Sequence, residues 1–107
     1  MSTLLHIDSS PLQSSISREL TREFTKAWKE KNPEGRVIDR NLSAAPSKPI
    51  DHIWVGAAYT PEAARTEEQK AVLADSDALI AELEQAEEIV IGVAMHNFSI
   101  PSVLKLW

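Results

Sequence analysis

The chain has 107 residues, of which 43% are hydrophobic and 25% are charged, and it contains no cysteine. Its length suits one globular domain with a modest core, and the missing cysteines exclude disulfides, thiol catalysis and cysteine-ligated metal sites. The net charge of −5 at pH 7 argues against nucleic acid or an acidic membrane surface as the main partner.

The N-terminus predicts a buried strand over residues 3–8. This short apolar run stops at the polar residues Ser9 and Ser10, as a strand does where it enters a loop. The sequence lacks the basic and long apolar regions of a secretory signal, and no run approaches the roughly 18 apolar residues of a membrane-spanning helix. We therefore expect a cytoplasmic protein without a membrane partner.

An amphipathic helix is predicted from Ile16 onward, because Ile16, Leu20, Phe24 and Trp28 recur at every fourth residue. Helix-breaking residues at positions 32–35 end it. The helix also has a basic face, which we interpret as solvated surface rather than as a site for a nucleic-acid backbone. The residues of this face are Arg18, Arg22, Lys26 and Lys29.

The middle of the chain predicts short elements. Residues 36–41 form a strand whose charged flanks suggest the edge of a sheet, and residues 42–50, which contain two prolines, form a loop. A short helix is expected near residues 51–58. The sequence Thr60-Pro61-Glu62 has the composition of a further helix start.

The longest predicted helix begins with a capping box at Thr66–Gln69 and runs to about Gln85. Its apolar face consists of Val72, Leu79, Ile80 and Leu83.

An unbroken apolar run from Ile89 to Ala94 predicts a parallel strand that helices cover on both faces. Residues 95–99 form a polar and aromatic loop, and Pro101 opens another helix. Alternating strands and helices indicate an α/β fold: a three-layer α-β-α sandwich with a parallel sheet and right-handed crossovers.

Two loops of this fold are candidate ligand sites. In open parallel sheets, ligands bind beyond the carboxyl ends of the strands, at the point where the strand order reverses. With the strand order 2-1-3, the loop over residues 9–17 and the loop over residues 95–99 follow neighbouring strands. We therefore expect the two loops to face each other across one crevice.

The first loop is rich in serine and leads into a helix. Five of its nine residues are serine, and the free amides of a helix N-terminus favour an anion such as a terminal phosphate. The alternative is that the serines only cap the helix and solvate the loop. Neither GxxxxGK[ST] nor GxGxxG occurs in the sequence, which excludes a Walker loop and a Rossmann-type NAD site in this stretch.

The second loop combines aromatic rings with amide donors in the run Met95-His96-Asn97-Phe98. A planar heteroaromatic ligand with polar edges needs that mixture. The alternative is that Met95 and Phe98 fill the core and Asn97 is a turn residue.

Residues 95–107 resemble the M-[aromatic]-N-F-x-x-P-x-x-L-K-x-[WF] signature of the FMN-dependent NADH-azoreductase and quinone-reductase family. The serine loop is similar to that family's phosphate loop, and residues 73–83 resemble its helix before the third strand. The resemblance implies a flavodoxin-like fold, with sheet order 2-1-3-4-5, of which this chain would hold strands 2-1-3. Residues 1–107 would then be a single flavodoxin-like domain that is incomplete at its C-terminus, with an exposed apolar edge at the third strand.

The resemblance also implies a cofactor site. Ser10, Ser15, Ile16 and Ser17 would hold the FMN phosphate. The isoalloxazine ring would be lined by Met95, His96, Asn97 and Phe98. Two departures from the family pattern stand out, because the phosphate loop lacks the glycine often found there and position 96 is usually Tyr or Trp. A protonated His96 beside the ring would raise the flavin potential.

The implied activity is two-electron transfer from NADH through FMN to a quinone or an azo compound, in a homodimer. No protein acid or base is required, so no catalytic residue is assigned. The alternatives are an FMN-binding electron-transfer module that does not turn over NADH, and a truncated product without activity.

Other kinds of site find little support in the sequence. His6, His52 and His96 lie far apart without ligand spacing, so no metal site is expected, and His6 is interpreted as a core residue with its polar atoms satisfied. The missing GxSxG motif argues against a serine hydrolase.

Overall fold

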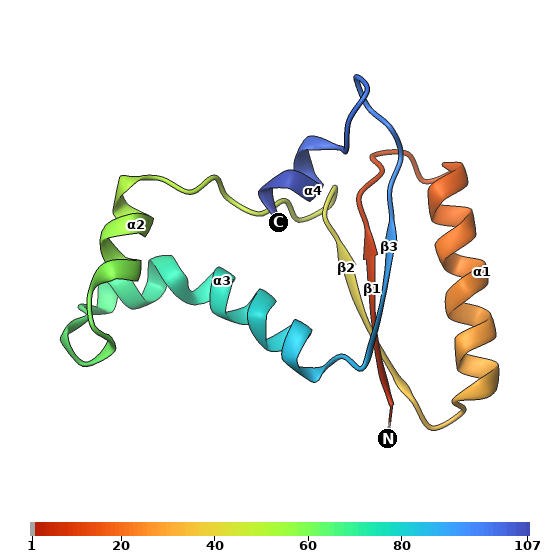
Figure 1. Cartoon of the computed structure of the whole chain (residues 1–107), viewed down its shortest axis with the longest axis horizontal. Helices are drawn as coiled ribbons and strands as arrows, with labels where there is room; N and C mark the ends of the chain where they lie inside the picture. The colour runs from red at the N-terminus through yellow and green to blue at the C-terminus, as the bar shows by residue number, and fades with distance from the viewer. Residues whose placement is uncertain (1) are drawn as a thin grey trace.

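The computed structural model describes residues 2–107 as a parallel sheet with helices on both sides (Figure 1). In chain order the elements are β1 (Thr3–Asp8), α1 (Ile16–Lys31), β2 (Arg36–Asn41), α2 (His52–Tyr59), a 3₁₀ turn (Glu62–Ala64), α3 (Glu67–Gln85), β3 (Glu88–Gly92) and α4 (Ser102–Leu106).

The sheet has the order β2-β1-β3, and both neighbours run parallel to β1. Asp8 at the end of β1 pairs with Asn41 on one side and with Gly92 on the other. The three strands therefore end in one row, and the loops that follow them leave from the same edge of the sheet. The predicted α/β class, the strand order 2-1-3 and the edge position of β2 are confirmed.

Strand β1 forms the centre of the core, and every one of its residues is buried. Because side chains alternate along a strand, Leu5 and Ile7 face the layer that contains α4, where they pack with Leu42 and the partly buried Val103 and Leu104. The opposite face carries His6 and Asp8 and meets α1. The predicted three layers are therefore present, with α1 on one side and α4 on the other (Figure 1).

Helix α1 begins and ends as its sequence predicts. Ser15 caps its N-terminus, and the amide of Asn32 donates to the Trp28 carbonyl at its C-terminus. Trp28 is buried over Gly35, where an added Cβ would lie 2.5 Å from the indole ring. The rest of the apolar stripe is open to solvent, since Ile16, Leu20 and Phe24 are exposed. Periodicity thus predicted the helix but not how much of its face is covered.

Helices α2 and α3 form an arm that stands away from the sheet (Figure 1). The predicted capping box at Thr66 and Gln69 is present, and Trp54 Nε1 donates to Ser76 Oγ across the arm at 3.0 Å. Thr60-Pro61-Glu62 opens only a 3₁₀ turn, because Arg65 turns back to the carbonyls of Ala57 and Thr60 before α3 begins.

The apolar face predicted for α3 is also only partly covered. Leu73 is buried on this helix, whereas Ile80 and Leu83 remain exposed. Near its C-terminal end the arm is tied to the sheet by an ion pair between Arg40 and Glu82. The hydrogen bond to Glu82 is the main cause of a raised pKa of the Arg40 guanidinium.

The position of the arm leaves one face of β3 uncovered. A compact domain of this length has a radius of gyration of about 13 Å, whereas the value here is 16.1 Å. The expectation that helices cover β3 on both faces is wrong, because Ile89, Ile91 and Val93 are 46%, 41% and 46% exposed. The strand also ends at Gly92 instead of Ala94. The expected exposed apolar edge at the third strand is confirmed.

Candidate functional site

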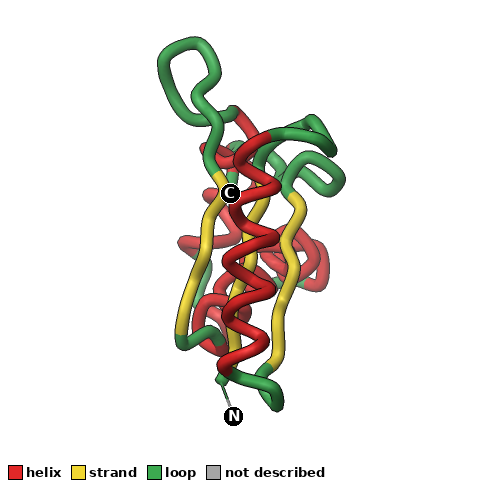
Figure 2. The backbone as a smooth tube through the Cα atoms, turned by 90° about the vertical axis from the view of Figure 1, so that its right-hand side faces the viewer, coloured by secondary structure: helices red, strands yellow, loops and turns green. Residues whose placement is uncertain are grey.

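The serine loop and the loop over residues 95–99 both leave the carboxyl edge of the sheet. They follow the neighbouring strands β1 and β3, and in the backbone view both rise beyond the same ends of the strands (Figure 2). This edge is where open parallel sheets bind ligands.

The first serines of the loop are buried, and the side chain of Ser9 holds the loop to the sheet. Ser9 and Ser10 are 0% and 2% exposed. Ser9 Oγ donates to the Gly92 carbonyl at 2.7 Å, and Ser43 Oγ donates to the Ser9 carbonyl at 3.2 Å. Ser10 Oγ accepts from the Leu12 amide at 3.2 Å. The beginning of the loop is therefore fixed to β3 and to the segment after β2.

The later serines lie at the start of α1. Ser15 Oγ accepts from the Arg18 amide at 3.2 Å and lies 3.2 Å from Ser17 Oγ. The first turn of the helix closes when the Glu19 amide donates to the Ser15 carbonyl. The amides of Ile16 and Ser17 precede that turn, so they belong to the free donors that helix N-termini offer to anions.

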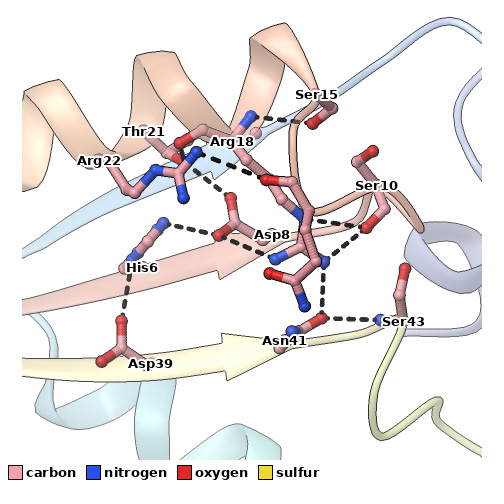
Figure 3. A network of polar contacts seen from close by, with 12 residues as sticks. His6, Asp8, Ser10, Ser15, Arg18, Thr21, Arg22, Asp39, Asn41 and Ser43 are labelled. Atoms are coloured by element: carbon pink, nitrogen blue, oxygen red, sulfur yellow. Dashed lines mark hydrogen bonds and ion pairs between the residues drawn. The ribbon is translucent and has the colours of Figure 1, made fainter.

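Arg18 does not lie on a solvated face, so the interpretation of the basic face is wrong at this position. Its side chain is buried among three segments (Figure 3). Nε and Nη2 donate to the Ser10 carbonyl at 3.1 and 2.5 Å, and Nη2 also donates to Asn41 Oδ1 at 3.0 Å. Nη1 lies 3.7 Å from Asp8 Oδ2. Arg22, Lys26 and Lys29 are exposed, as predicted.

Asp8 is the buried carboxylate at the centre of this network. Thr21 Oγ1 donates to Asp8 Oδ1 at 2.7 Å, and His6 Nε2 lies 3.1 Å from Asp8 Oδ2 without the alignment of a hydrogen bond. On its other side, His6 Nδ1 is 2.9 Å from Asp39 Oδ1. His6 is therefore a core residue between two carboxylates, but its Nε2 has no hydrogen-bond partner among the described residues, so the expectation that its polar atoms are satisfied is wrong. Within residues 2–107, no cluster of three or more His, Asp or Glu side chains could hold a metal ion.

The sequence did contain a signal for Arg18. An acidic residue at the end of a buried strand must find a cation or several donors, and Asp8 occupies that place. The nearest arginine or lysine along the chain is Arg18, in the first turn of the next helix.

Gly92 is a second residue that sequence reasoning missed. An added Cβ would lie 2.9 Å from Thr21 Cγ2, 3.0 Å from Asp8 Oδ1 and 3.3 Å from the Ser17 carbonyl. A glycine at the end of β3 therefore lets the start of α1 approach the sheet closely. Because glycine has no side chain, the N-terminus of α1 can lie this close to the carboxyl edge of the sheet.

The second loop is a tight turn. The amides and carbonyls of His96 and Ser99 bond each other at 2.8 and 2.9 Å. Between them, Asn97 and Phe98 have φ values of 49° and 62°, so both adopt the left-handed conformation of a type I′ turn. Asn tolerates this conformation, whereas Phe does so only at a cost.

The side chains of this turn face solvent. Met95 is 75% and Phe98 is 92% exposed, so the alternative is wrong in placing these two residues in the core, although its other part, Asn97 as a turn residue, is correct. The left-handed backbone at Phe98 costs free energy, and so does the exposure of its apolar ring to water. Such unfavourable features are typical of a binding loop.

The carboxyl edge thus offers two kinds of contact. The start of α1 supplies amide and hydroxyl donors for an anion, and the turn supplies exposed apolar side chains and backbone groups for a flat ring. All eight residues predicted for the cofactor lie in these two loops. The arrangement suits an elongated ligand with an anionic group at one end.

The sequence also matches known proteins. The family described as having a flavodoxin-like fold matches residues 2–107. An FMN-dependent NADH:quinone oxidoreductase from Acidobacterium capsulatum is 60% identical over 107 residues, which are 100% of this chain and 52% of that protein. A protein of the same name from a Marinomonas species is 48% identical over 98% of this chain and 54% of its own length. The chain therefore spans about half the length of these relatives.

Solved structures share the fold. An azoreductase from Bacillus anthracis strain Sterne superposes with a TM-score of 0.86 at 21% identity, covering 99% of this chain and 53% of that one. An FMN-dependent NADH-azoreductase from Bacillus anthracis strain Ames Ancestor, solved in complex with FMN, gives 0.82 at 25% identity over 97% of this chain and 52% of its own. On the match over residues 2–107 and the sheet order β2-β1-β3, the chain belongs to the family with the flavodoxin-like fold.

Proposed function

We propose that this chain binds FMN at the carboxyl edge of its sheet and serves an NADH-dependent oxidoreductase that reduces quinones or azo compounds. The observation that carries the proposal is the pairing, at one edge, of a helix-start anion site with an exposed, strained aromatic turn. The names of the two relatives described above point to the same activity.

The residues at the phosphate end fit the cofactor. Ser15, Ile16 and Ser17 would supply two hydroxyl groups and two helix-start amides to the dianionic phosphate. Ser10, whose own hydroxyl accepts a bond from the Leu12 amide, would contribute its hydroxyl proton. The nearest buried cation, Arg18, already faces Asp8, so most of the attraction for the phosphate would come from backbone and hydroxyl donors.

The ring end relies on the turn. Met95, His96, Asn97 and Phe98 would line the isoalloxazine ring, with the left-handed backbone at Asn97 and Phe98 directing amides and carbonyls to its polar rim. When bound, the flavin supplies the two-electron chemistry, and the protein contributes binding, orientation and electrostatics. The chain's residues would hold the ring so that donor and acceptor occupy its open face in turn.

A flavin titration tests the proposal. The chain is titrated with FMN while flavin fluorescence is followed, and NADH consumption is then measured with a quinone and with an azo dye. We expect quenched fluorescence, and turnover by the loaded protein. Binding without NADH oxidation would indicate an electron-transfer module instead, and no binding would contradict the site.

A pair of serine variants localises the phosphate. The double variant Ser15→Ala/Ser17→Ala removes two hydroxyls from the half-buried helix start, and we expect FMN to bind at least about tenfold more weakly. The matched control is Ser14→Ala in the same loop, where the side chain is exposed and affinity should not change. Equal effects of both variants would argue against a phosphate at this position.

We further propose that the chain acts in the cytoplasm as part of a homodimer. The arm carries exposed apolar residues at Ile53, Val55 and Tyr59, and a groove of about 530 Å³ lies between the arm and the C-terminal residues Leu106 and Trp107. Of the helices in residues 2–107, none is long and apolar enough to cross a membrane. Sedimentation velocity of the chain and of Tyr59→Glu tests the dimer, which the variant should weaken.

A further inference from the structure

We propose that Arg18 is a positioning residue that sets the serine loop for phosphate binding without needing to touch the phosphate. This inference rests on the proposed FMN site and adds to it a residue outside the eight predicted contacts. It follows from the place of the guanidinium between three segments of the chain (Figure 3).

The contacts of Arg18 join the two ends of the serine loop. Its backbone amide donates to Ser15 Oγ at the helix start. Its guanidinium donates twice to the Ser10 carbonyl at the beginning of the loop. One residue therefore spans the segment that carries all four predicted phosphate contacts. This side chain therefore ties Ser10 directly to the helix start that carries the donors at Ile16 and Ser17.

Two further contacts hold the guanidinium itself in place. Asn41 Oδ1 accepts from Nη2 at 3.0 Å and also accepts from the amides of Ser43 and Ala44 at 3.2 and 3.3 Å. Asp8, which lies 3.7 Å from Nη1, is itself fixed by Thr21. The guanidinium of Arg18 thus contacts the ends of β1 and β2. Through these contacts it connects the loop to the sheet.

The charge of Arg18 and its shape can be separated by experiment. The side chain is 7% exposed and its charge is balanced by Asp8, so a direct pull on a phosphate is not its main effect. The planar fork matters because two N–H bonds that converge on one carbonyl oxygen fix direction as well as distance. A lysine keeps the charge but loses the fork, which makes Arg18→Lys the decisive variant.

The experiment compares FMN with riboflavin, which has the same ring but no phosphate. Dissociation constants for both flavins are measured by fluorescence for the full chain, Arg18→Lys, Arg18→Met and the control Arg22→Met. Arg22 lies one turn further along α1, is exposed, and reaches only the Gln13 carbonyl at 3.5 Å. The original chain should bind FMN more tightly than riboflavin.

We expect Arg18→Met to weaken FMN binding by roughly ten- to a hundredfold, the loss expected from bonds to a charged group, and riboflavin binding by less than about threefold. Arg18→Lys should fall between the original chain and Arg18→Met for FMN. Arg22→Met should change neither constant by more than about twofold. Equal weakening of both flavins would mean that Arg18 only stabilises the fold, and full FMN affinity in Arg18→Lys would mean that charge alone suffices. Either result overturns the proposal.

Hydrogen exchange provides a readout that does not depend on flavin. In Arg18→Lys without ligand, the amide of Leu12 should exchange at least about tenfold faster than in the original chain, while the amides of β1 keep their protection. Unchanged exchange at Leu12 would overturn the proposal even if Arg18→Met fails to fold. If the original chain binds neither flavin, the proposed function fails, whereas exchange still tests whether Arg18 holds the loop.

Discussion

The serine loop and the turn over residues 95–99 lie at the same edge of the sheet but are held in opposite ways. The serine loop begins with two buried serines. The Ser9 side chain donates to β3, and the carbonyls of Ser9 and Ser10 accept from the side chains of Ser43 and Arg18. The turn is closed by two backbone bonds between His96 and Ser99, and its side chains stand in solvent. One loop is held by side-chain hydrogen bonds that tie it to other segments, and the other is held by its own backbone.

This difference teaches how the two ends of a ligand would be recognised. A phosphate needs several donors at fixed positions, and in the proposed site the buried network would hold them in place before binding, which lowers the entropy lost on association. A flat ring needs a surface and a few backbone groups, so the turn can fix its backbone and leave its side chains to adapt. Substitutions in the two loops should therefore change the free energy of unfolding in opposite directions and by different amounts.

The largest effect is expected from Gly92→Val, which should break the network beneath the serine loop. The new side chain would meet Thr21 Cγ2 and Asp8 Oδ1 at 3.0 Å or less from its Cβ alone, and we expect a loss of about 2–3 kcal/mol in unfolding free energy, as overpacking costs. Urea unfolding followed by circular dichroism measures it.

The matched control for Gly92→Val is Gly56→Ala in helix α2, where nothing lies within 4 Å of an added Cβ. This variant should raise the unfolding free energy by about 0.5–1 kcal/mol, because alanine favours a helix over glycine. A Gly92→Val protein as stable as the original would show that the helix start is not held against β3.

A smaller loss of about 1–3 kcal/mol is expected from Thr21→Val, which removes a donor from the buried Asp8 carboxylate while keeping the shape of the side chain. The control is Thr25→Val one turn later, whose hydroxyl bonds only the Thr21 carbonyl within α1. Both variants are compared by thermal and urea unfolding. Similar losses in the two would indicate that the Asp8 network contributes no more than an ordinary helix contact.

In the turn, Phe98→Gly should have the opposite effect on stability. Glycine adopts a φ of 62° without the cost that an L-side chain carries there, so unfolding free energy should stay the same or rise by up to about 1 kcal/mol. Affinity for FMN should fall in the same variant, because the ring loses an apolar partner. A protein that loses stability would show that Phe98 packs against the fold.

The smallest expected effect concerns His96→Tyr. An exposed charge near a ring is worth at most about 1 kcal/mol, which corresponds to about 20 mV for a two-electron couple. The bound flavin's midpoint potential, measured from pH 5 to 8, should be higher for the histidine protein than for the tyrosine variant by no more than about this amount. Identical potentials at every pH would remove His96 from the list of groups that tune the ring.

Local signals in the sequence carried most of the fold. The spacing of Ile16 to Trp28 gave helix α1, the Thr66 and Gln69 capping box gave the start of α3, and the apolar runs gave β1 and β3. These succeed because backbone hydrogen bonding and capping depend on neighbours in sequence. The position of the two loops then followed from the rule for parallel sheets.

What the sequence did not reveal depends on contacts between distant segments. The burial of Arg18 requires Asp8 and Asn41 to end neighbouring strands, and the need for glycine at position 92 arises only when α1 lies against β3. The type I′ turn contains Asn97 but has Phe98 where glycine is usual, so its composition gave no such signal. One face of β3 is exposed because helix α3, which precedes this strand, extends away from the sheet instead of packing on it.

Because the three strands end in one row, the number of residues in β1 cannot change without shifting the register of its side chains. Asp8 is level with Asn41 and Gly92, and alternate residues of the strand serve different layers. Deleting one residue from β1 would point the Asp8 carboxylate into the apolar core beneath α4. It would also place a leucine or isoleucine next to Arg18. Changes in chain length should therefore be tolerated in the outer loop at Gln13 and Ser14, where the backbone is open to water, and not within the central strand.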